Sequence, residues 1–418
     1  LKINQRALAL REAGHDLVHF GFGQAPFPIP PSVVSALQEN AHHKDYLPTR
    51  GLFELREQIA QYYDDQFDYP FDPELICIGP GSKELIYQAL LCLQGEVLVP
   101  APSWVSYGPQ VSLTGREMVP IFTQELNHYK LTAEELREAC ISRPRGQKVL
   151  IINSPNNPTG AVYHDEEISH LVEVCRAYQV IVISDEIYAE IDFTGQRKKG
   201  FFTLYPEGTI VTGGLSKAHA AGGYRLGFLA TSAPLRPLID ALCSVISETF
   251  SAVSAPIQRA AIAAYQSNDE IRRFIEDTRA IHQLCGQYLA KRLNDLGITT
   301  PDPRGAFYLM PNFEIYRGPL LKRGVSTSEE LCALLLDEYY IALLPGSDFY
   351  LSPSELKVRL ATVDYDGEAT LIAYRALTRS YSLDLSDEPL IDRFIQDHCP
   401  QLSKAIIRLN RFATEMSQ

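Results

Sequence analysis

The sequence lacks the patterns that mark several classes of protein. Its 8 cysteines are dispersed, with no two at CxxC spacing, so neither a metal site nor a disulfide framework is expected. No apolar run approaches the roughly 18 residues of a membrane span, and no secretion signal is evident. Reduced, buried thiols in a chain without such segments are typical of a cytoplasmic protein that has no membrane partner.

Positive charge is also scarce. The chain has 38 Lys and Arg against 51 Asp and Glu, a formal net charge of −13 at pH 7. Nucleic-acid binding needs a basic surface, so no nucleic-acid partner is expected. The composition, 45% hydrophobic and 21% charged, is that of a globular protein, and 418 residues suffice for about two or three domains.

Short apolar runs alternate with helical segments from about residue 52 to 265. Segments such as Leu85–Leu93 and Glu166–Tyr178 have apolar residues at steps of three and four, which predicts helices. Near-continuous apolar strands separated by helices indicate an α/β fold with a mostly parallel sheet covered on both faces. The strands are expected at Glu74–Ile78, Glu96–Val99, Val149–Asn153, Val180–Ser184, Thr209–Val211 and Leu226–Ala230.

The pattern changes after residue 268. A long charged helix, Asp269–Leu296, leads into short strands and helices that predict a smaller α+β domain. Two more amphipathic helices, divided at Pro400, are expected at the end of the chain. The expected organisation is a large domain at 45–268, a discontinuous small domain at 1–44 and 269–380, and a C-terminal helical extension at 381–418.

Lys217 is the first residue with a chemical signature. It follows an apolar strand that ends in Gly213-Gly214, and the small residues after it leave room for a ligand close to the backbone. Lysine forms Schiff bases with aldehydes, and burial lowers its pKa so that it can act as nucleophile and base. Arg225, eight residues on, could reach an anion held beside it. The ordinary alternative is a surface lysine after a strand.

Polar residues follow two other expected strands. Asp185 ends one strand, and Tyr188 stands three residues later. Because ligands bind at the carboxyl ends of strands in open α/β sheets, this carboxylate could keep a pyridine nitrogen protonated and make the ring an electron sink. Tyr188, together with Asn157 in the turn after an earlier strand, could donate to a phenolic oxygen of that ring. Taken alone, each segment also fits an ordinary strand end or turn.

Two further segments could bind other parts of a ligand. Ser82 and Lys83 begin a helix after Gly79-Pro80-Gly81, and the free N–H groups of a helix N-terminus suit a phosphate dianion. Trp104, the only tryptophan, follows another strand and could stack on a planar ring. Taken alone, these segments fit a capped helix start and a core tryptophan equally well.

Together the segments resemble the class I/II aminotransferases, enzymes of fold type I that use pyridoxal 5′-phosphate (PLP). The resemblance extends to about residue 380. It implies a PLP-binding large domain, a smaller α+β domain and a homodimer with active sites at the subunit interface. The matching strings are Gly21–Pro30, Asp45–Arg56, Gly214–Gly227, Gly305–Tyr308, Leu344–Gly346 and Lys357–Ala361.

The resemblance also implies a role for each matching residue. Lys217 would form the internal aldimine with PLP and carry protons, Asp185 would pair with the pyridinium nitrogen, and Tyr188 would act with it in catalysis. The expected cofactor-binding residues are Tyr46 from a neighbouring subunit, Ser82, Lys83 through its backbone, Trp104, Asn157, Asp185, Tyr188, Lys217 and Arg225. The expected substrate-binding residues, which would hold the α-carboxylate, are Gly23, Asn157 and Arg359.

Two positions depart from the family pattern. Gly214 stands where many relatives have serine, which predicts the loss of one phosphate contact. Arg50 stands where a small residue is common, and it is the one candidate cation for a second substrate carboxylate. The alternative, a solvated or phosphate-facing loop residue, is preferred, and it favours a broad or neutral and aromatic substrate range over strict aspartate use.

The expected activity is transfer of an amino group between an amino acid and a 2-oxo acid by a ping-pong mechanism. The motifs do not separate this reaction from other PLP chemistry on the fold, such as C–S β-elimination or cyclopropane-forming elimination. A regulator that uses the fold as a ligand sensor would need a DNA-binding module, and no helix-turn-helix segment or basic arm is evident before the PLP-enzyme region.

Overall fold

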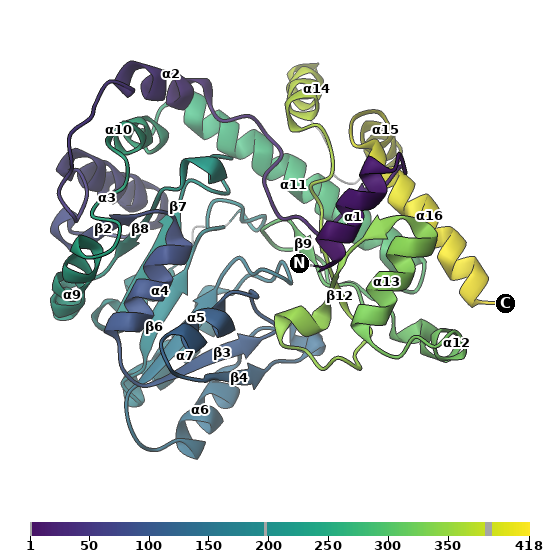
Figure 1. Ribbon diagram of the computed structural model, residues 1–418, viewed down its shortest axis with the longest axis horizontal. Coiled ribbons are helices and arrows are strands. Elements are labelled where there is room, and N and C mark those ends of the chain that lie inside the picture. The colour runs from purple at the N-terminus through teal and green to yellow at the C-terminus, as the bar shows by residue number, and fades with distance from the viewer. Residues whose placement is uncertain (1, 196–198, 381–386) are drawn as a thin grey trace.

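A computed structural model describes residues 2–195, 199–380 and 387–418. Figure 1 shows two parts. The large sheet and the helices that cover it lie at the left, and a smaller part, which carries both chain ends, lies at the right. Helix α11 (Asp269–Asp295) runs between the two parts. Residues 381–386, the start of the expected C-terminal extension, lie outside the described residues.

The large sheet has seven strands in the order β2-β8-β7-β6-β5-β3-β4. All pair in parallel except β8, which is antiparallel to both of its neighbours. The expected mostly parallel sheet is thus confirmed. The strands are β2 (Ile76–Gly79), β3 (Glu96–Ala101), β4 (Met118–Phe122), β5 (Lys148–Asn153), β6 (Ile181–Asp185), β7 (Thr209–Gly214) and β8 (Gly227–Ala230).

Strand β4 is absent from the sequence-based expectation. It lies at the edge of the sheet and contains Pro120, which cannot donate a hydrogen bond to a neighbouring strand. Its exposure is mixed, with Phe122 64% exposed, so it lacks the continuous apolar character of the central strands.

Alternate side chains along the central strands point to opposite faces of the sheet, and helices bury both faces. Val97 and Val99 pack in one cluster with Leu85, whereas Leu98 between them packs with Leu171 on the other face. The first face is covered by α4 (Ser82–Cys92), α5 (Tyr107–Leu113) and α9 (Arg236–Ser247). The second is covered by α6 (Ala133–Ser142), α7 (Asp165–Ala177) and α8 (Phe201–Leu204).

Three helices complete the large part. Residues of α3 (Phe53–Phe67), including Leu55 and Ile59, join the core cluster that also contains β2 and β8. Helix α10 (Ala255–Ala264) packs on α3, and α2 (Pro31–Asn40) packs on α10. Helix α2 therefore lies beside the large sheet, although it precedes residue 45.

The smaller part contains two short sheets and several helices. Strands β11 (Leu344–Pro345), β12 (Val358–Ala361) and β9 (Tyr308–Leu309) pair antiparallel in that order, and β1 (Val18–His19) pairs in parallel with β10 (Ile341–Ala342). The helices are α1 (Lys2–Glu12), α12 (Arg317–Lys322), α13 (Ser328–Tyr339) and α14 (Gly367–Ser380). None of the helices within the three described ranges combines the length and apolar character of a membrane span.

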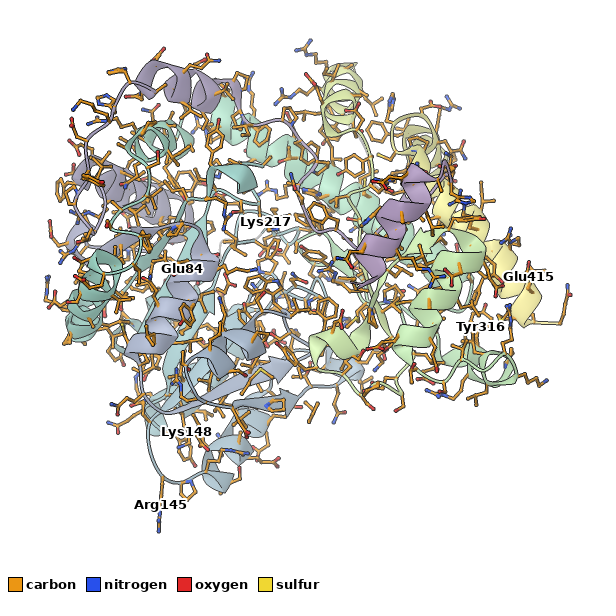
Figure 2. The ribbon with its side chains drawn as sticks, viewed as in Figure 1. Glu84, Arg145, Lys148, Lys217, Tyr316 and Glu415 are labelled. Atoms are coloured by element: carbon orange, nitrogen blue, oxygen red, sulfur yellow. The ribbon has the colours of Figure 1, made fainter. Side chains whose placement is uncertain are left out.

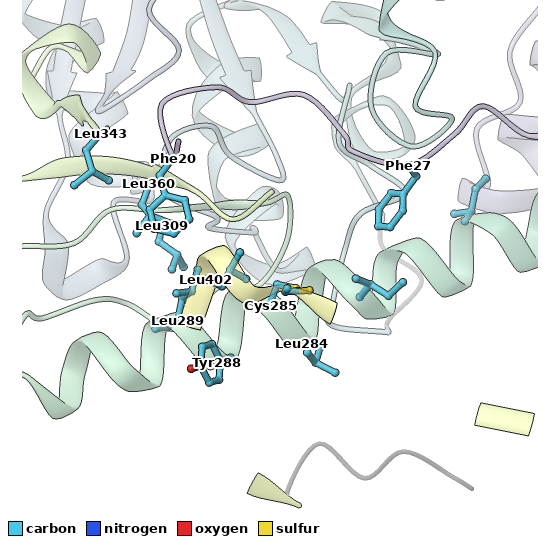
Figure 3. Packing of buried hydrophobic residues seen from close by; sticks show 14 of the residues in the cluster. Phe20, Phe27, Leu284, Cys285, Tyr288, Leu289, Leu309, Leu343, Leu360 and Leu402 are labelled. Atoms are coloured by element: carbon cyan, nitrogen blue, oxygen red, sulfur yellow. The ribbon is translucent and has the colours of Figure 1, made fainter. Parts of the chain in front are cut away.

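The C-terminal helices close the core of this smaller part. Helix α15 (Glu388–His398) and α16 (Pro400–Met416) both pack on α11. Figure 3 shows Leu402 at the start of α16 beside Leu289 and Cys285 of α11. The same face of α16 buries Leu409 and Phe412. The resemblance supplies no role for this segment, and the structure gives it a packing role.

Candidate functional site

The register of the large sheet brings the expected site segments to one edge. Asn153, at the end of β5, pairs with Asp185, at the end of β6, and Asp185 pairs with Thr212 of β7. Gly79 and Gly214 both pair with Gly227 of β8. The carboxyl ends of β2, β5, β6 and β7 therefore meet beside the first residues of β8. Figure 2 shows Lys217 just beyond this edge, near the middle of the molecule.

Lys217 is half-buried and points toward the chain segment that crosses from the smaller part. Its Nζ donates a 2.7 Å hydrogen bond to the Gly23 carbonyl oxygen. The same nitrogen lies 5.6 Å from the centre of the Tyr188 ring and 5.5 Å from that of Phe307. An amine in this aromatic setting is partly shielded from water and accessible to a small ligand.

Asp185 is buried in a donor-rich setting. Tyr107 Oη donates a 2.6 Å hydrogen bond to its Oδ2, and Thr212 Oγ1 lies 3.4 Å from its Oδ1. Burial raises the pKa of Asp185 to about 6, although these donors and the charge of Lys217 act to lower it. A carboxylate held in this way is suited to pairing with a buried cationic ring nitrogen.

Tyr188 and Asn157 link the region of Asp185 to the smaller part. The Tyr188 and Tyr308 hydroxyls are 2.9 Å apart, and burial raises the pKa of Tyr188 well above its ordinary value. Asn157 N–H donates to Asn153 Oδ1, and Asn153 Nδ2 donates to the Asp185 carbonyl oxygen, each over 2.8 Å. The Tyr188 ring lies beside Lys217 Nζ, and Asn157 Oδ1 lies 3.4 Å from Arg359 Nη1, so both side chains border the region of Lys217 and Arg359.

The amino end of α4 forms a cradle without side chains. Gly81 has φ +93, which favours glycine, and a Cβ there would lie 2.5 Å from Arg225 Nη2. A Cβ on Gly227 would collide with the Ser82 backbone nitrogen. Arg225 donates to the Pro80 carbonyl oxygen at 3.1 Å. Ser82, the first N–H groups of α4 and Arg225 thus lie together, as an anion site at a helix start requires.

The segment after β3 brings two aromatic residues to the same region. Trp104 is half-buried, and its ring meets the Tyr107 ring edge to face at 5.3 Å. Lys83 Nζ lies 5.0 Å from the Trp104 ring centre. The Lys83 side chain therefore packs on the tryptophan, while its backbone belongs to the start of α4.

Arg359 is a buried guanidinium with spare hydrogen-bonding capacity. It is 5% exposed and lies between the rings of Tyr308, at 4.8 Å, and Phe349, at 5.1 Å. Nη2 donates to the Gly21 carbonyl oxygen at 2.8 Å, and Nη1 lies 3.4 Å from Asn157 Oδ1. Nε has no hydrogen-bond partner among the described residues. Because a buried, incompletely paired cation is costly, the position is suited to a carboxylate ligand.

Gly23 lies next to these groups, and its lack of a side chain has a clear cause. A Cβ at this position would collide with the Tyr308 hydroxyl, which itself lies 3.4 Å from the Gly23 carbonyl oxygen. Gly214 is similarly constrained, because a Cβ there would lie 2.7 Å from the Leu226 carbonyl oxygen. The close approach of β8 to β7 explains the glycine at this departure from the family pattern.

Tyr46 and Arg50 do not join the site within the single chain. The Tyr46 side chain is 95% exposed. Arg50 Nη1 donates to Glu74 Oε2 at 2.8 Å, and Nη2 lies 3.7 Å from Asp240 Oδ1. Glu74 precedes the amino end of β2, whereas Lys217 lies beyond the carboxyl edge of the sheet. The Arg50 guanidinium is therefore engaged at the opposite edge.

The grouped residues fit PLP. Lys217 can bond an aldehyde, Asp185 can pair with a pyridinium, the start of α4 can bind a phosphate, and Arg359 retains an unpaired N–H for a substrate carboxylate. Tyr107, Tyr308 and Phe349 have no expected role from the sequence. Tyr107 stands three residues after Trp104, at the start of α5, and this closeness to Trp104 is the sequence signal that could have pointed to it.

Comparisons with known proteins agree with this geometry. The family model described as aminotransferase class I and II matches residues 15–372. An aspartate aminotransferase of Geobacillus stearothermophilus is 36% identical over 373 residues, which cover 87% of this chain and 91% of the relative. An asparagine–oxo-acid transaminase of Streptococcus mutans is 30% identical over 87% of this chain and 91% of its own length.

Solved structures give the same result. An aspartate aminotransferase from Thermus thermophilus with maleate superimposes with a TM-score of 0.82 at 26% identity, over 98% of this chain and 95% of its own. An aromatic aminotransferase from Pyrococcus horikoshii gives a TM-score of 0.80 at 28% identity, over 98% and 99% of the two chains.

Proposed function

Because this chain belongs to the class I and II aminotransferases, we propose that the carboxyl edge of its large sheet is the active site and that Lys217 bonds the cofactor. The fold is that of fold-type I, and the chain is a PLP-dependent transaminase acting on amino acids and 2-oxo acids. The alternative elimination chemistry is not favoured, because these relatives are named as aminotransferases.

One observation supports the assignment of the site above all others. The hydrogen-bonded pair Tyr188–Tyr308 lies between Lys217, which approaches the Tyr188 ring, and Arg359, which packs on the Tyr308 ring. A small amino acid whose carboxylate pairs with Arg359 would thereby present its Cα toward Lys217. Binding at a fixed carboxylate also orients the bonds at Cα, which decides which bond is broken.

Each residue contributes a separate function in this proposal. PLP, when bound, supplies an electron sink that stabilises negative charge at the substrate Cα. With PLP bound, Lys217 Nζ would take up the proton from the substrate Cα and hold it for transfer. Asp185 holds the proton on the ring nitrogen, and Tyr188 and Asn157 donate to the ring oxygen. Trp104 stacks on the ring.

The remaining assignments concern anions and assembly. Ser82, the Lys83 backbone N–H and Arg225 bind the phosphate, and Arg359, the Gly23 amide and Asn157 bind the substrate carboxylate. We propose a cytoplasmic homodimer in which Tyr46 reaches the phosphate bound by the other subunit, which is supported by its 95% exposure in the single chain. The proposed division is 45–268 as the large domain, 1–44 and 269–380 as the small domain, and 381–418 as the C-terminal extension. Within 1–44, α2 packs on α10 and so lies against the large domain.

Aspartate is proposed as one amino donor. The names of several relatives support it, among them the Geobacillus stearothermophilus and Bacillus subtilis aspartate aminotransferases. The ion pairs of Arg50 with Glu74 and Asp240 argue that this residue does not bind the second carboxylate.

Borohydride trapping tests the central assignment. Reduction of the holoenzyme followed by peptide mapping should place the pyridoxyl group on Lys217. Lys217→Arg should lose both the label and turnover, whereas Lys322→Arg, at the end of α12, should retain both. A label on Lys83 would contradict the proposal.

A further inference from the structure

Tyr350 connects the two halves of the candidate site. It follows the short 3-10 helix η7 (Gly346–Phe349) after β11, in the smaller part. Its hydroxyl accepts a hydrogen bond from Gly108 N–H at 2.8 Å and donates to the Val105 carbonyl oxygen at 2.8 Å. The Trp104 carbonyl oxygen lies 3.4 Å away. One hydroxyl thus meets two backbone positions of the turn between β3 and α5 and one in the first turn of α5.

The Tyr350 hydroxyl fits closely against the backbone of Gly108, where a larger residue would displace it. A Cβ on Gly108 would lie 2.8 Å from Tyr350 Oη, so the turn has no side chain where the hydroxyl approaches. Tyr350 itself has φ +72, a conformation that favours glycine or asparagine over tyrosine. A second hydrogen bond joins the same two segments, because Ser103 N–H donates to the Phe349 carbonyl oxygen at 3.2 Å.

The turn on one side of this contact carries cofactor-facing residues. Trp104 begins it, and Tyr107, whose N–H bonds the Trp104 carbonyl oxygen at 3.2 Å, ends it. Tyr107 in turn donates to Asp185. A shift of this turn would therefore move both an aromatic ring and a donor to the buried carboxylate.

The segment on the other side carries part of the carboxylate site. Phe349, the residue before Tyr350, packs its ring 5.1 Å from the Arg359 guanidinium. Strand β11, which leads into η7, pairs with β12 at Leu344 and Arg359. The position of Tyr350 is therefore tied to that of Arg359 through both a ring contact and a strand pairing.

We propose that Tyr350 is a positioning residue for transamination. Its hydroxyl fixes the Trp104–Gly108 turn against the segment that buries Arg359, so that the stacking ring and the carboxylate-binding guanidinium keep one relative geometry. The inference rests on the roles proposed above for Trp104 and Arg359. Small misplacements of reacting groups are costly in enzymes, and a displacement of ~1 Å can reduce the rate about 100-fold.

The single tryptophan of the chain makes a direct test possible. Emission of Trp104 reports on this turn alone. We would compare wild type, Tyr350→Phe and the control Tyr178→Phe, whose exposed side chain lies at the end of α7. In PLP-free protein, acrylamide quenching of Trp104 should rise about twofold in Tyr350→Phe only, because the freed turn admits the quencher more often.

Kinetics of the holoenzyme provide the functional readout. Tyr350→Phe should lower kcat/KM about 10-fold or more for every amino donor, with an increase in KM, because the carboxylate site and the ring lose their alignment. Gly108→Ala displaces the same hydroxyl and should have the same effect. In the double variant the two effects should not add, since both act through one contact. Additive effects would contradict the inference.

The outcomes separate this inference from the proposed function. If PLP fails to quench Trp104 emission in wild type, the stacking role of Trp104 is wrong and the inference falls with it. If PLP quenches normally but acrylamide quenching and kcat/KM are equal in wild type and Tyr350→Phe, only the positioning role of Tyr350 is wrong. Gly108→Ala gives the same decision if Tyr350→Phe does not fold.

Discussion

The hydroxyl of Tyr107 donates a 2.6 Å hydrogen bond to Oδ2 of Asp185, and both side chains are buried. The two residues are 78 positions apart and come from the start of α5 and the end of β6. Of the groups that lower the pKa of Asp185 against the effect of burial, the Tyr107 hydroxyl is the largest. Tyr107 therefore opposes the effect of burial on the pKa of Asp185 and favours the ionised carboxylate.

Tyr107→Phe should weaken the hold of Asp185 on the ring nitrogen. Without the donor, the pKa of Asp185 should rise above its value of about 6, so a larger fraction is protonated near neutral pH. A hydrogen bond to a charged group is worth roughly 1.5–3 kcal/mol, so kcat should fall at least about 10-fold. The pH profile of kcat should show its acidic limb displaced to higher pH. Tyr178→Phe serves as the control, and an unshifted limb in Tyr107→Phe would contradict the role.

The pKa of Asp185 also predicts how stability varies with pH. Its value of about 6 in the folded protein is above the ordinary 3.8, so the folded state binds the proton more tightly than the unfolded state. Stability of the PLP-free protein should therefore fall as pH rises from about 4 to 6, by up to about 3 kcal/mol from this group.

Asp185→Asn isolates that effect from those of other buried acids. The variant should be more stable than wild type above pH 6, and the difference should shrink as pH falls toward 4. Urea unfolding of the two PLP-free proteins across this range measures it. A difference that does not change with pH would mean that Asp185 has an ordinary pKa.

Subunit mixing tests the proposed homodimer. Tyr46→Phe and Lys217→Ala subunits should each have low activity, because one lacks a phosphate contact and the other the cofactor lysine. A hybrid dimer has one site with neither change, so random mixing should restore about a quarter of wild-type activity. No gain on mixing, or an active monomer by light scattering, would exclude the arrangement.

Much of the fold could be predicted because the central strands are apolar on both faces. The missed strand β4 contains Pro120 and lies at an edge, where side chains need not be apolar. For α16 the apolar stripe with Leu402 and Phe412 was evident, but its partner α11 was not. An amphipathic pattern shows that a face is buried and does not name the surface that buries it.

The candidate site also has a part that the sequence predicts and a part that it does not. Residues in short local motifs, such as Lys217 and Asp185, could be placed by their position after strands. The Tyr107–Asp185 and Tyr350–Gly108 contacts join segments far apart in the sequence, and no local pattern records them. Arg50 shows the opposite limit, because its place four residues after Tyr46 does not reveal that Glu74 and Asp240 hold its guanidinium.

Arg359→Lys should reduce kcat/KM for all amino donors by a similar factor. Guanidinium binds a carboxylate through two parallel hydrogen bonds, and an ammonium provides only a point charge. The aromatic rings of Tyr308 and Phe349, which pack on the planar group, would also lose their partner. A loss of about 10- to 100-fold, equal for aspartate and phenylalanine, is expected. A loss confined to one donor would mean that Arg359 binds the side chain of that substrate.

Arg50→Ala should leave the choice of substrate unchanged. Its guanidinium bonds the Glu74 carboxylate and carbonyl oxygen and lies near Asp240, at the edge of the sheet opposite Lys217. Removing it should cost stability at that edge, by about 1 kcal/mol or less for a partly exposed pair. The ratio of kcat/KM for aspartate to that for phenylalanine should equal the wild-type ratio, whichever donor the enzyme prefers. A strong preference for aspartate that collapses only in Arg50→Ala would show that this arginine leaves Glu74 to bind the second carboxylate.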